Sequence, residues 1–473
     1  MSDSICDRDF HDEGLKQKTG RLSIAHCRTI TRIFCACCLV ATFVTSTPAT
    51  AQDVKATLPF PALPRDEKAR EPPTDDATLR GTLTYISDIN AVVDGGMNRG
   101  ANYLQRIGLI GDADLDRALG WHGASAHISV HLISGTGLSA RRVGNLLTVS
   151  GIEAEPAARL FNLWLEQKVG NKVSVRIGQF TAAQEFAVSP TAALFVNSTF
   201  GWPASFATDL PSGGPAYPLA APGVRLSFNN GKGFDLRMAV FAGDPAGPGT
   251  GDPQRRDLHG FNGFGLKGRP FIIGELSRSG AGLDPASTVT IGGWVHGDNF
   301  DDLAIDDNYA SLAAPTSTGI ALTHRGNWSV YALVDTRVWR QGSRSIRAFL
   351  RATASPADRN PIDLYLDAGL SISAPLRARA GDIVGLGIAL GRISPRLRSR
   401  ILEQAARSGI RSSVPGFEAL VEASWQVQLH PNFSVQPSVQ FVFHPAAAIL
   451  STDSSAAFPT MAVVLGVRTS VRF

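Results

Sequence analysis

The sequence predicts an all-β protein, namely an antiparallel transmembrane β-barrel of about 16 strands with short turns at one end and longer loops at the other. Three observations predict it. Apolar and polar residues alternate with a period of two along most of the chain. The apolar face of each alternating segment carries almost no charge over about 9–11 residues, the length of a tilted membrane strand. No segment after residue 52 is apolar enough for a membrane-spanning helix, and otherwise only a closed barrel pairs every backbone polar group in lipid.

The alternation is clearest near the C-terminus. In residues 418–430 the odd positions from Ala419 to Leu429 are apolar and the even positions are mostly polar. The same pattern continues through 433–443, 460–473, 328–338, 346–352, 362–373, 234–242 and 126–132. Short helix-like pieces interrupt it only near 111–120 and 396–408.

Parity of the two faces fixes how the strands 418–430 and 433–443 pair, because opposed residues of an antiparallel pair share a face. A three-residue loop over 430–432 keeps like faces together, and it opposes Leu429 to Phe433, Val427 to Val435 and Glu422 to Gln440. Leu420 and Val442 then meet on the polar face, where apolar residues are unexpected.

The N-terminal part of the chain predicts export. Residues 1–51 are expected to be a signal peptide with an extended leader, because basic residues precede the apolar run 33–44 and small residues permit cleavage near Ala51. Residues 52–78 are rich in proline and charge and predict a periplasmic tether, and residues 79–473 form the predicted barrel. All five cysteines precede residue 52, so the exported chain has no thiol for a disulfide.

Charged side chains lie on the polar face of the predicted strands, which favours apolar faces turned toward lipid and a wet interior. Aromatic residues near strand ends are expected in the membrane girdle: Trp328, Trp339, Trp425, Phe433, Phe443 and Phe473. A barrel of this size holds a water-filled channel, so the expected function is passive diffusion of small solutes. The alternative of a different class is a secreted, soluble β-sandwich that binds a ligand and turns its apolar faces inward.

Arginine, carboxylate and glutamine side chains on the polar face are the candidate pore lining. Arginine supplies planar donors that hold hydroxyl groups, and Asp, Glu and Gln supply acceptors. The candidates for solute contact are Glu166, Arg176, Gln179, Glu185, Asp209, Arg225, Arg237, Arg337, Arg351, Glu418, Glu422, Gln428, Gln440 and Arg468. From the same reasoning, replacing Glu422 with Leu should reduce sugar affinity or conductance more than the same change at Glu403.

The run ARLFNLWLEQKVGNKVSVRIGQFTAAQEFAVSPTAALFVNSTFGWPASF, residues 158–206, resembles the carbohydrate-selective porin family of Gram-negative outer membranes. The resemblance continues through Tyr217-Pro218, FAGDP at 241–245, DIVGLG at 382–387 and residues 417–445. It implies a sixteen-stranded outer-membrane porin with a constriction of Arg and Glu that passes glucose-type sugars. It also implies surrounding lipopolysaccharide, barrel assembly directed by the terminal Phe473, and a homotrimer or a monomer. His444-Pro445-Ala446-Ala447 departs from the family's usual Asn-Pro-Gly turn.

Other function classes find little support. The chain has 45 basic and 41 acidic residues that intermingle, whereas a nucleic-acid-binding protein carries a basic face. No nucleophile elbow, phosphate loop or HExxH motif predicts an enzyme, and no cofactor is expected. His127 and His131 lack a third ligand, and the acidic stretch 301–307 is expected to be a solvated loop, although it could hold a divalent cation between lipopolysaccharide groups. A general porin without sugar preference remains the alternative within the pore class.

Overall fold

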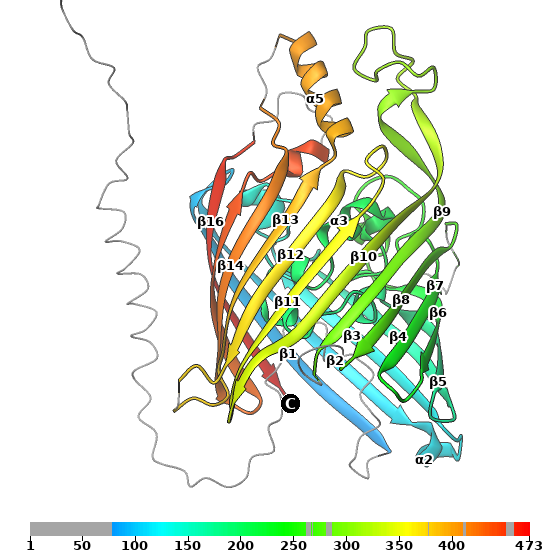
Figure 1. Cartoon of the computed structure of the whole chain (residues 1–473), viewed down its shortest axis with the longest axis vertical. Coiled ribbons are helices and arrows are strands. Elements are labelled where there is room, and N and C mark those ends of the chain that lie inside the picture. The colour runs from blue at the N-terminus through cyan, green and yellow to red at the C-terminus, as the bar shows by residue number, and fades with distance from the viewer. Residues whose placement is uncertain are drawn as a thin grey trace, which may run out of the picture. The chain divides into compact units, whose positions relative to one another are not determined.

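The barrel is the main feature of the computed structural model, which describes residues 78–261, 266, 268–280, 286–376, 378–409, 413–450 and 458–473. Sixteen antiparallel strands form a closed ring in which each strand pairs with its neighbours in sequence and β16 returns to β1 (Figure 1). This confirms the predicted fold class. The predicted signal peptide, its cleavage near Ala51 and most of the tether lie outside the described residues.

The strands vary in length, and their bounds are as follows. They are β1 (Leu79–Gly95), β2 (Gly100–Asp114), β3 (Ala124–Gly135), β4 (Ala157–Val169), β5 (Val173–Phe180), β6 (Ala221–Asn229), β7 (Phe234–Phe241), β8 (Phe271–Ser279), β9 (Thr288–Asp306), β10 (Ala321–Gln341), β11 (Arg344–Ala354), β12 (Ile362–Ser373), β13 (Ile383–Ile393), β14 (Phe417–His430), β15 (Phe433–Phe443) and β16 (Met461–Arg472). Barrel closure extends to the last residue, because Phe473 N donates to Leu83 O (2.9 Å) and Leu83 N donates to Phe473 O (3.2 Å).

Helices are short, and two of them match the predicted helical pieces. They are α2 (Leu115–Leu119), α3 (Ala204–Asp209), α4 (Pro253–Arg256) and α5 (Pro395–Arg407). Asp114 caps α2 by accepting from the backbone of residues 116 and 117, and Gly120 ends it in the left-handed conformation. Ser394 caps α5, and Pro395 occupies its first turn, where a missing amide hydrogen costs nothing. Among the described residues, no helix is long and apolar enough to cross a membrane.

Connections differ in length at the two ends of the barrel, and this difference orients it. At the end that carries the C-terminus, strands are joined by short turns such as 170–172, 342–343 and 431–432. At the other end lie α5, the tall β9–β10 hairpin and the longer loops (Figure 1). Short turns face the periplasm in bacterial barrels and long loops face outward. We therefore call the two ends the periplasmic end and the extracellular end.

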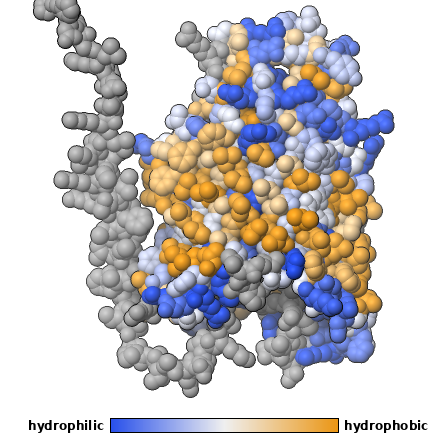
Figure 2. All heavy atoms as spheres, in the orientation of Figure 1, coloured by the Kyte–Doolittle hydropathy of each residue, from blue (hydrophilic) through white to orange (hydrophobic). Residues whose placement is uncertain are grey.

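The outer wall is apolar, as predicted. Side chains such as Ile89, Ile177 and Leu386 are about half exposed although they lie in the middle of strands. Figure 2 shows a broad hydrophobic band between hydrophilic ends on the visible face. The predicted girdle aromatics lie on this outer face: Trp328, Trp339, Phe443 and Phe473 are exposed, and Trp425 and Phe433 are half-buried. The apolar faces thus point away from the barrel interior.

The predicted register of β14 and β15 is right in its body and wrong at its turn. Val427 pairs with Val435, and Glu422 pairs with Gln440, as parity requires. Leu429 does not pair with Phe433; His430 does, and the register shifts between Gln428 and His430. A two-residue turn followed by a bulge thus replaces the predicted three-residue loop. The bulge leaves one residue of β14 unpaired, so beyond it lipid-facing residues again oppose lipid-facing residues.

Two segments fold into the barrel from its extracellular end. We call residues 136–156 the first inner segment and residues 181–220, which include α3, the second inner segment. Their apolar side chains pack on apolar residues of the inner wall, where Leu147, Val149 and Phe195 join one cluster with Leu420 and Val442. Leu420 and Val442 are the apolar exceptions on the polar face, and the inner segments pack against them.

Candidate functional site: the barrel lumen

Polar groups on the inner wall bind the backbone of the inner segments. The Glu422 carboxylate accepts hydrogen bonds from Val196 N (2.7 Å) and Asn197 N (2.9 Å). Gln440, its partner across the β14–β15 pair, accepts from Asn197 Nδ2 (3.0 Å) and donates to Val149 O (2.9 Å). Both side chains are fully buried. These two predicted lining residues hold the inner segments against the wall.

Arg351 on β11 also binds the second inner segment. Its guanidinium forms two hydrogen bonds with the Asp367 carboxylate (3.0 and 2.5 Å), and both side chains are fully buried. It also donates to Ala187 O (2.7 Å), Thr199 O (3.0 Å) and Phe200 O (3.1 Å). One arginine thus joins β11 and β12 to two points of the second inner segment.

Four of the predicted residues form one ion cluster on β4, β5, β6 and the start of the second inner segment. Arg176 pairs with Glu166 (2.7 Å) and with Glu185, and Arg225 pairs with Glu166 (2.7 Å) and Glu185 (3.5 Å). The Arg176 guanidinium also lies 3.7 Å from the centroid of the Trp164 ring. All four charged residues are buried, so their charges balance one another within the wall.

The remaining predicted residues are spread over several environments. Glu418 accepts from the backbone of residues 146, 147 and 446, Gln179 donates to Leu160 O (3.1 Å), and Arg237 pairs with Asp235 (2.9 Å) and Glu275 (3.3 Å). Asp209 is buried at the end of α3, where it accepts from Ile362 N (3.4 Å). Arg337 is half-buried in β10, and Gln428 donates to His430 O (2.6 Å) beside a periplasmic turn. Neither of these last two lines the cavity described next.

A cavity of about 360 Å³ lies between the inner segments and the wall formed by β1, β2 and β14–β16. Its lining includes Arg106, Tyr217, Gln426, Gln436 and Arg468. The Arg106 guanidinium lies 5.6 Å from the centroid of the Tyr217 ring, and Phe161 meets that ring edge-on at 5.7 Å. This volume falls in the range of roughly 300–1,000 Å³ that small-molecule sites occupy.

Of the predicted residues, Arg468 borders this cavity, where both oxygens of Asp88 accept from it at 2.8 Å. Arg106, Tyr217 and Gln436 were not predicted. Arg106 could have been found, because it stands on the inward parity of β2, whereas Tyr103 and Leu109 on the other parity are exposed. Tyr217 lies in the second inner segment, where no period applies, and the only signal in the sequence was its place in the Tyr217-Pro218 motif of the family resemblance.

The histidine and acidic motifs take up ordinary wall and loop positions, with one exception. His127 stacks on Trp164 (4.9 Å between centroids) and His131 on Phe161 (4.4 Å). In the acidic stretch 301–307, Asp306 accepts from four groups of its own loop. Asp302 instead faces His324, at 2.8 Å.

The chain resembles known proteins along most of its length. The family model described as "Carbohydrate-selective porin, OprB family" matches residues 98–473. Porin B of Pseudomonas aeruginosa is 23% identical over 391 residues, which cover 77% of this chain and 82% of that protein. The high-pH structure of Pseudomonas putida OprB superimposes with a TM-score of 0.74 at 20% identity, covering 84% of this chain and 94% of that one, which supports the fold.

The family match covers well over half of the chain, and the barrel that it implies is the one described above. Porins of this family are channel proteins. The chain belongs to the OprB family of carbohydrate-selective porins, channels of the bacterial outer membrane through which carbohydrates diffuse.

Proposed function

We propose that glucose-type sugars pass through the cavity beside the inner segments and that its polar lining selects them. The observation that carries this proposal is the pairing of Arg106 with the Tyr217 ring at the cavity wall, 5.6 Å apart. Guanidinium donors bind sugar hydroxyl groups, and an aromatic face accommodates the apolar face of a sugar ring. Gln426, Gln436 and Arg468 offer further polar contacts. Several weak contacts suit conduction, since a tightly held solute would not leave.

We further propose that most of the predicted site residues act on the pore indirectly. Glu166, Arg176, Glu185, Arg225 and Arg351 are buried in ion pairs, and Glu418, Glu422 and Gln440 bind backbone groups of the inner segments. They determine where the inner segments lie and hence the width of the pore. Arg468 combines both roles, because it borders the cavity and donates to Ser150 Oγ (3.4 Å).

Replacing Arg106 with Ala should reduce the rate of glucose entry into liposomes several-fold relative to that of a zwitterionic amino acid of similar size. The variant loses the hydrogen-bond donors and the positive charge of Arg106 beside the Tyr217 ring. The shorter side chain also widens the cavity, which affects both solutes because they are of similar size. Arg99→Ala is the matched control, since Arg99 lies in the β1–β2 turn in an exposed ion pair with Asp94 (2.6 Å). Swelling rates of proteoliposomes measure both solutes. Equal rates for glucose and the amino acid in the parent protein would favour the general porin without sugar preference.

The surroundings of the barrel belong to the proposal as well. Lipopolysaccharide is expected around the extracellular end, and the exposed Phe473, which ends the closing strand, is expected to direct assembly by the barrel-assembly machinery. We propose export with cleavage near Ala51, a tether over 52–78, and either a homotrimer or a monomer in the membrane. The N-terminal sequence of the purified protein and its mass in detergent distinguish these forms.

A further inference from the structure

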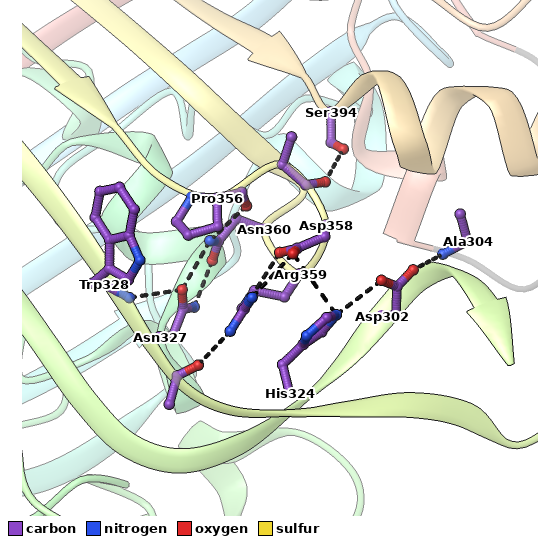
Figure 3. Close-up of polar contacts among 12 residues, drawn as sticks. Asp302, Ala304, His324, Asn327, Trp328, Pro356, Asp358, Arg359, Asn360 and Ser394 are labelled. Carbon is purple, nitrogen blue, oxygen red and sulfur yellow. Dashed lines mark hydrogen bonds and ion pairs between the residues drawn. The ribbon is translucent and has the colours of Figure 1, made fainter. Parts of the chain in front are cut away.

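We propose that Asp302, His324 and Asp358 form a binding site for a divalent transition-metal ion at the extracellular end of the barrel. The three residues come from three segments: the upper part of β9, the upper part of β10 and the β11–β12 loop. One ligand atom from each lies within 4.8 Å of the others. Figure 3 shows His324 between the two carboxylates.

The spacing of the donor atoms is close to that of tetrahedral coordination. His324 Nε2 lies 2.8 Å from Asp302 Oδ2 and 3.8 Å from Asp358 Oδ2. In a tetrahedral zinc site with metal–ligand bonds of about 2.0–2.2 Å, neighbouring donor atoms are about 3.3–3.6 Å apart. The two observed distances lie on either side of this range. Side-chain movements of about half an ångström would bring both into it.

Both carboxylates are held in place by groups that leave one oxygen directed at His324. The Asp302 side chain is fully buried, and its Oδ1 accepts from Ala304 N (2.8 Å) and Ile305 N (3.0 Å). Asp358 Oδ1 accepts from Arg359 Nε (2.7 Å), and Arg359 is itself fixed by donating to Gly326 O (2.8 Å). Hydrogen bonds of this kind orient the ligands of metal sites.

The donor set selects the class of ion. One imidazole nitrogen and two carboxylate oxygens suit Zn²⁺ and its neighbours in the first transition row, whereas Ca²⁺ and Mg²⁺ prefer oxygen ligands alone. His324 and Asp358 are partly exposed, at 19% and 25% of their side-chain surface, so an ion can enter and water can supply a fourth ligand. Arg359 also bonds Asp358 Oδ2 (3.0 Å), and Arg400 lies close enough to interact with Asp302, so we expect weaker binding than in a structural zinc site.

A bound ion would join the tall β9–β10 hairpin to the neighbouring β11–β12 loop. One backbone hydrogen bond, from Leu303 N to Asp358 O (2.7 Å), already connects these segments at the site. A metal bridge would therefore reduce the motion of the hairpin above the pore entrance.

The test is titration of the full chain, purified in detergent and freed of metal by a chelator, with Co²⁺ as an optical probe and Zn²⁺ as competitor. We expect a visible absorption band of tetrahedral Co²⁺ that saturates at one ion per chain and disappears on addition of Zn²⁺. In His324→Ala and Asp358→Asn the affinity should fall at least tenfold. Zn²⁺ should also slow protease cleavage within residues 307–320 of the parent chain and not of His324→Ala.

His122→Ala is the matched control. His122 likewise pairs with one carboxylate, that of Asp116 (2.8 Å). Among the described residues, no third metal-binding side chain lies close enough to complete a site with this pair. This variant should bind Co²⁺ as the parent does. Heat-modifiable migration on gels shows that each variant is folded. Absence of a saturable band in the folded parent, or an unchanged band in folded His324→Ala, would show that the cluster is an ion pair only and would overturn the proposal.

Discussion

Glu422→Leu will assemble as a barrel but lose discrimination between sugars and other solutes. Its ion current will be larger and noisier, and not smaller as the sequence alone suggested, because Glu422 holds an inner segment in place. The Glu422 carboxylate is the acceptor for Val196 N and Asn197 N, and it also accepts from Ser424 Oγ (2.7 Å). A leucine side chain cannot accept these hydrogen bonds. Each buried donor left without a partner lowers the stability of the folded protein by about 1–3 kcal/mol. The second inner segment should therefore leave the wall near Phe195 for part of the time. Single-channel recording measures the current, and liposome swelling measures the loss of sugar preference.

Glu403→Leu is the control for this change. Glu403 lies on α5 outside the barrel wall, where the hydrogen bond from Ser311 Oγ (2.6 Å) lowers the pKa of its carboxyl group. It also pairs with Arg407 one helical turn away (2.6 Å). Its replacement should leave both current and selectivity unchanged. Equal effects of the two substitutions would contradict the assignment of Glu422 to the lumen.

Of the substitutions proposed, Arg351→Met will produce the largest loss of stability of the folded barrel. Asp367 would remain as a buried carboxylate without its partner, a change that costs about 3–5 kcal/mol. The carbonyl groups of residues 187, 199 and 200 would lose their donor at the same time. The temperature at which the folded form disappears from heat-modifiable gels should fall by many degrees.

Arg407→Met is the matched control for Arg351→Met, because the Arg407–Glu403 pair is exposed on a helix, where solvent screens the two charges. It should leave the transition within a degree or two. The double variant Arg351→Met/Asp367→Leu removes both buried charges and should recover part of the loss. If Arg351→Met melted like its control, the buried pair would carry no part of the barrel's stability.

Period-two alternation predicts the fold because a barrel wall has only two faces, and one of them meets lipid. The β14–β15 pairing of Glu422 with Gln440 followed from parity alone. Its failure at Leu429 has a physical cause, since a bulge can change the turn without changing which side chains face lipid.

The inner segments could not be predicted in the same way, because their conformation comes from contacts with the wall and not from a local period. One trace of them was present in the sequence. Leu420 and Val442 break the polar face at the place where Leu147, Val149 and Phe195 pack. The candidate site was predictable only in part for the same reason. The alternation identifies the charged residues of the polar face. Whether each of them meets solute or binds an inner segment depends on residues more than 100 positions away.

Conductance of the purified protein in a planar bilayer, recorded while glucose is added, tests the central claim most directly. Apolar outer faces and a polar cavity beside fixed inner segments predict discrete current steps, each reduced or interrupted by glucose in a saturable way. A bilayer that shows no steps, or steps that glucose leaves unchanged at every concentration, would contradict it.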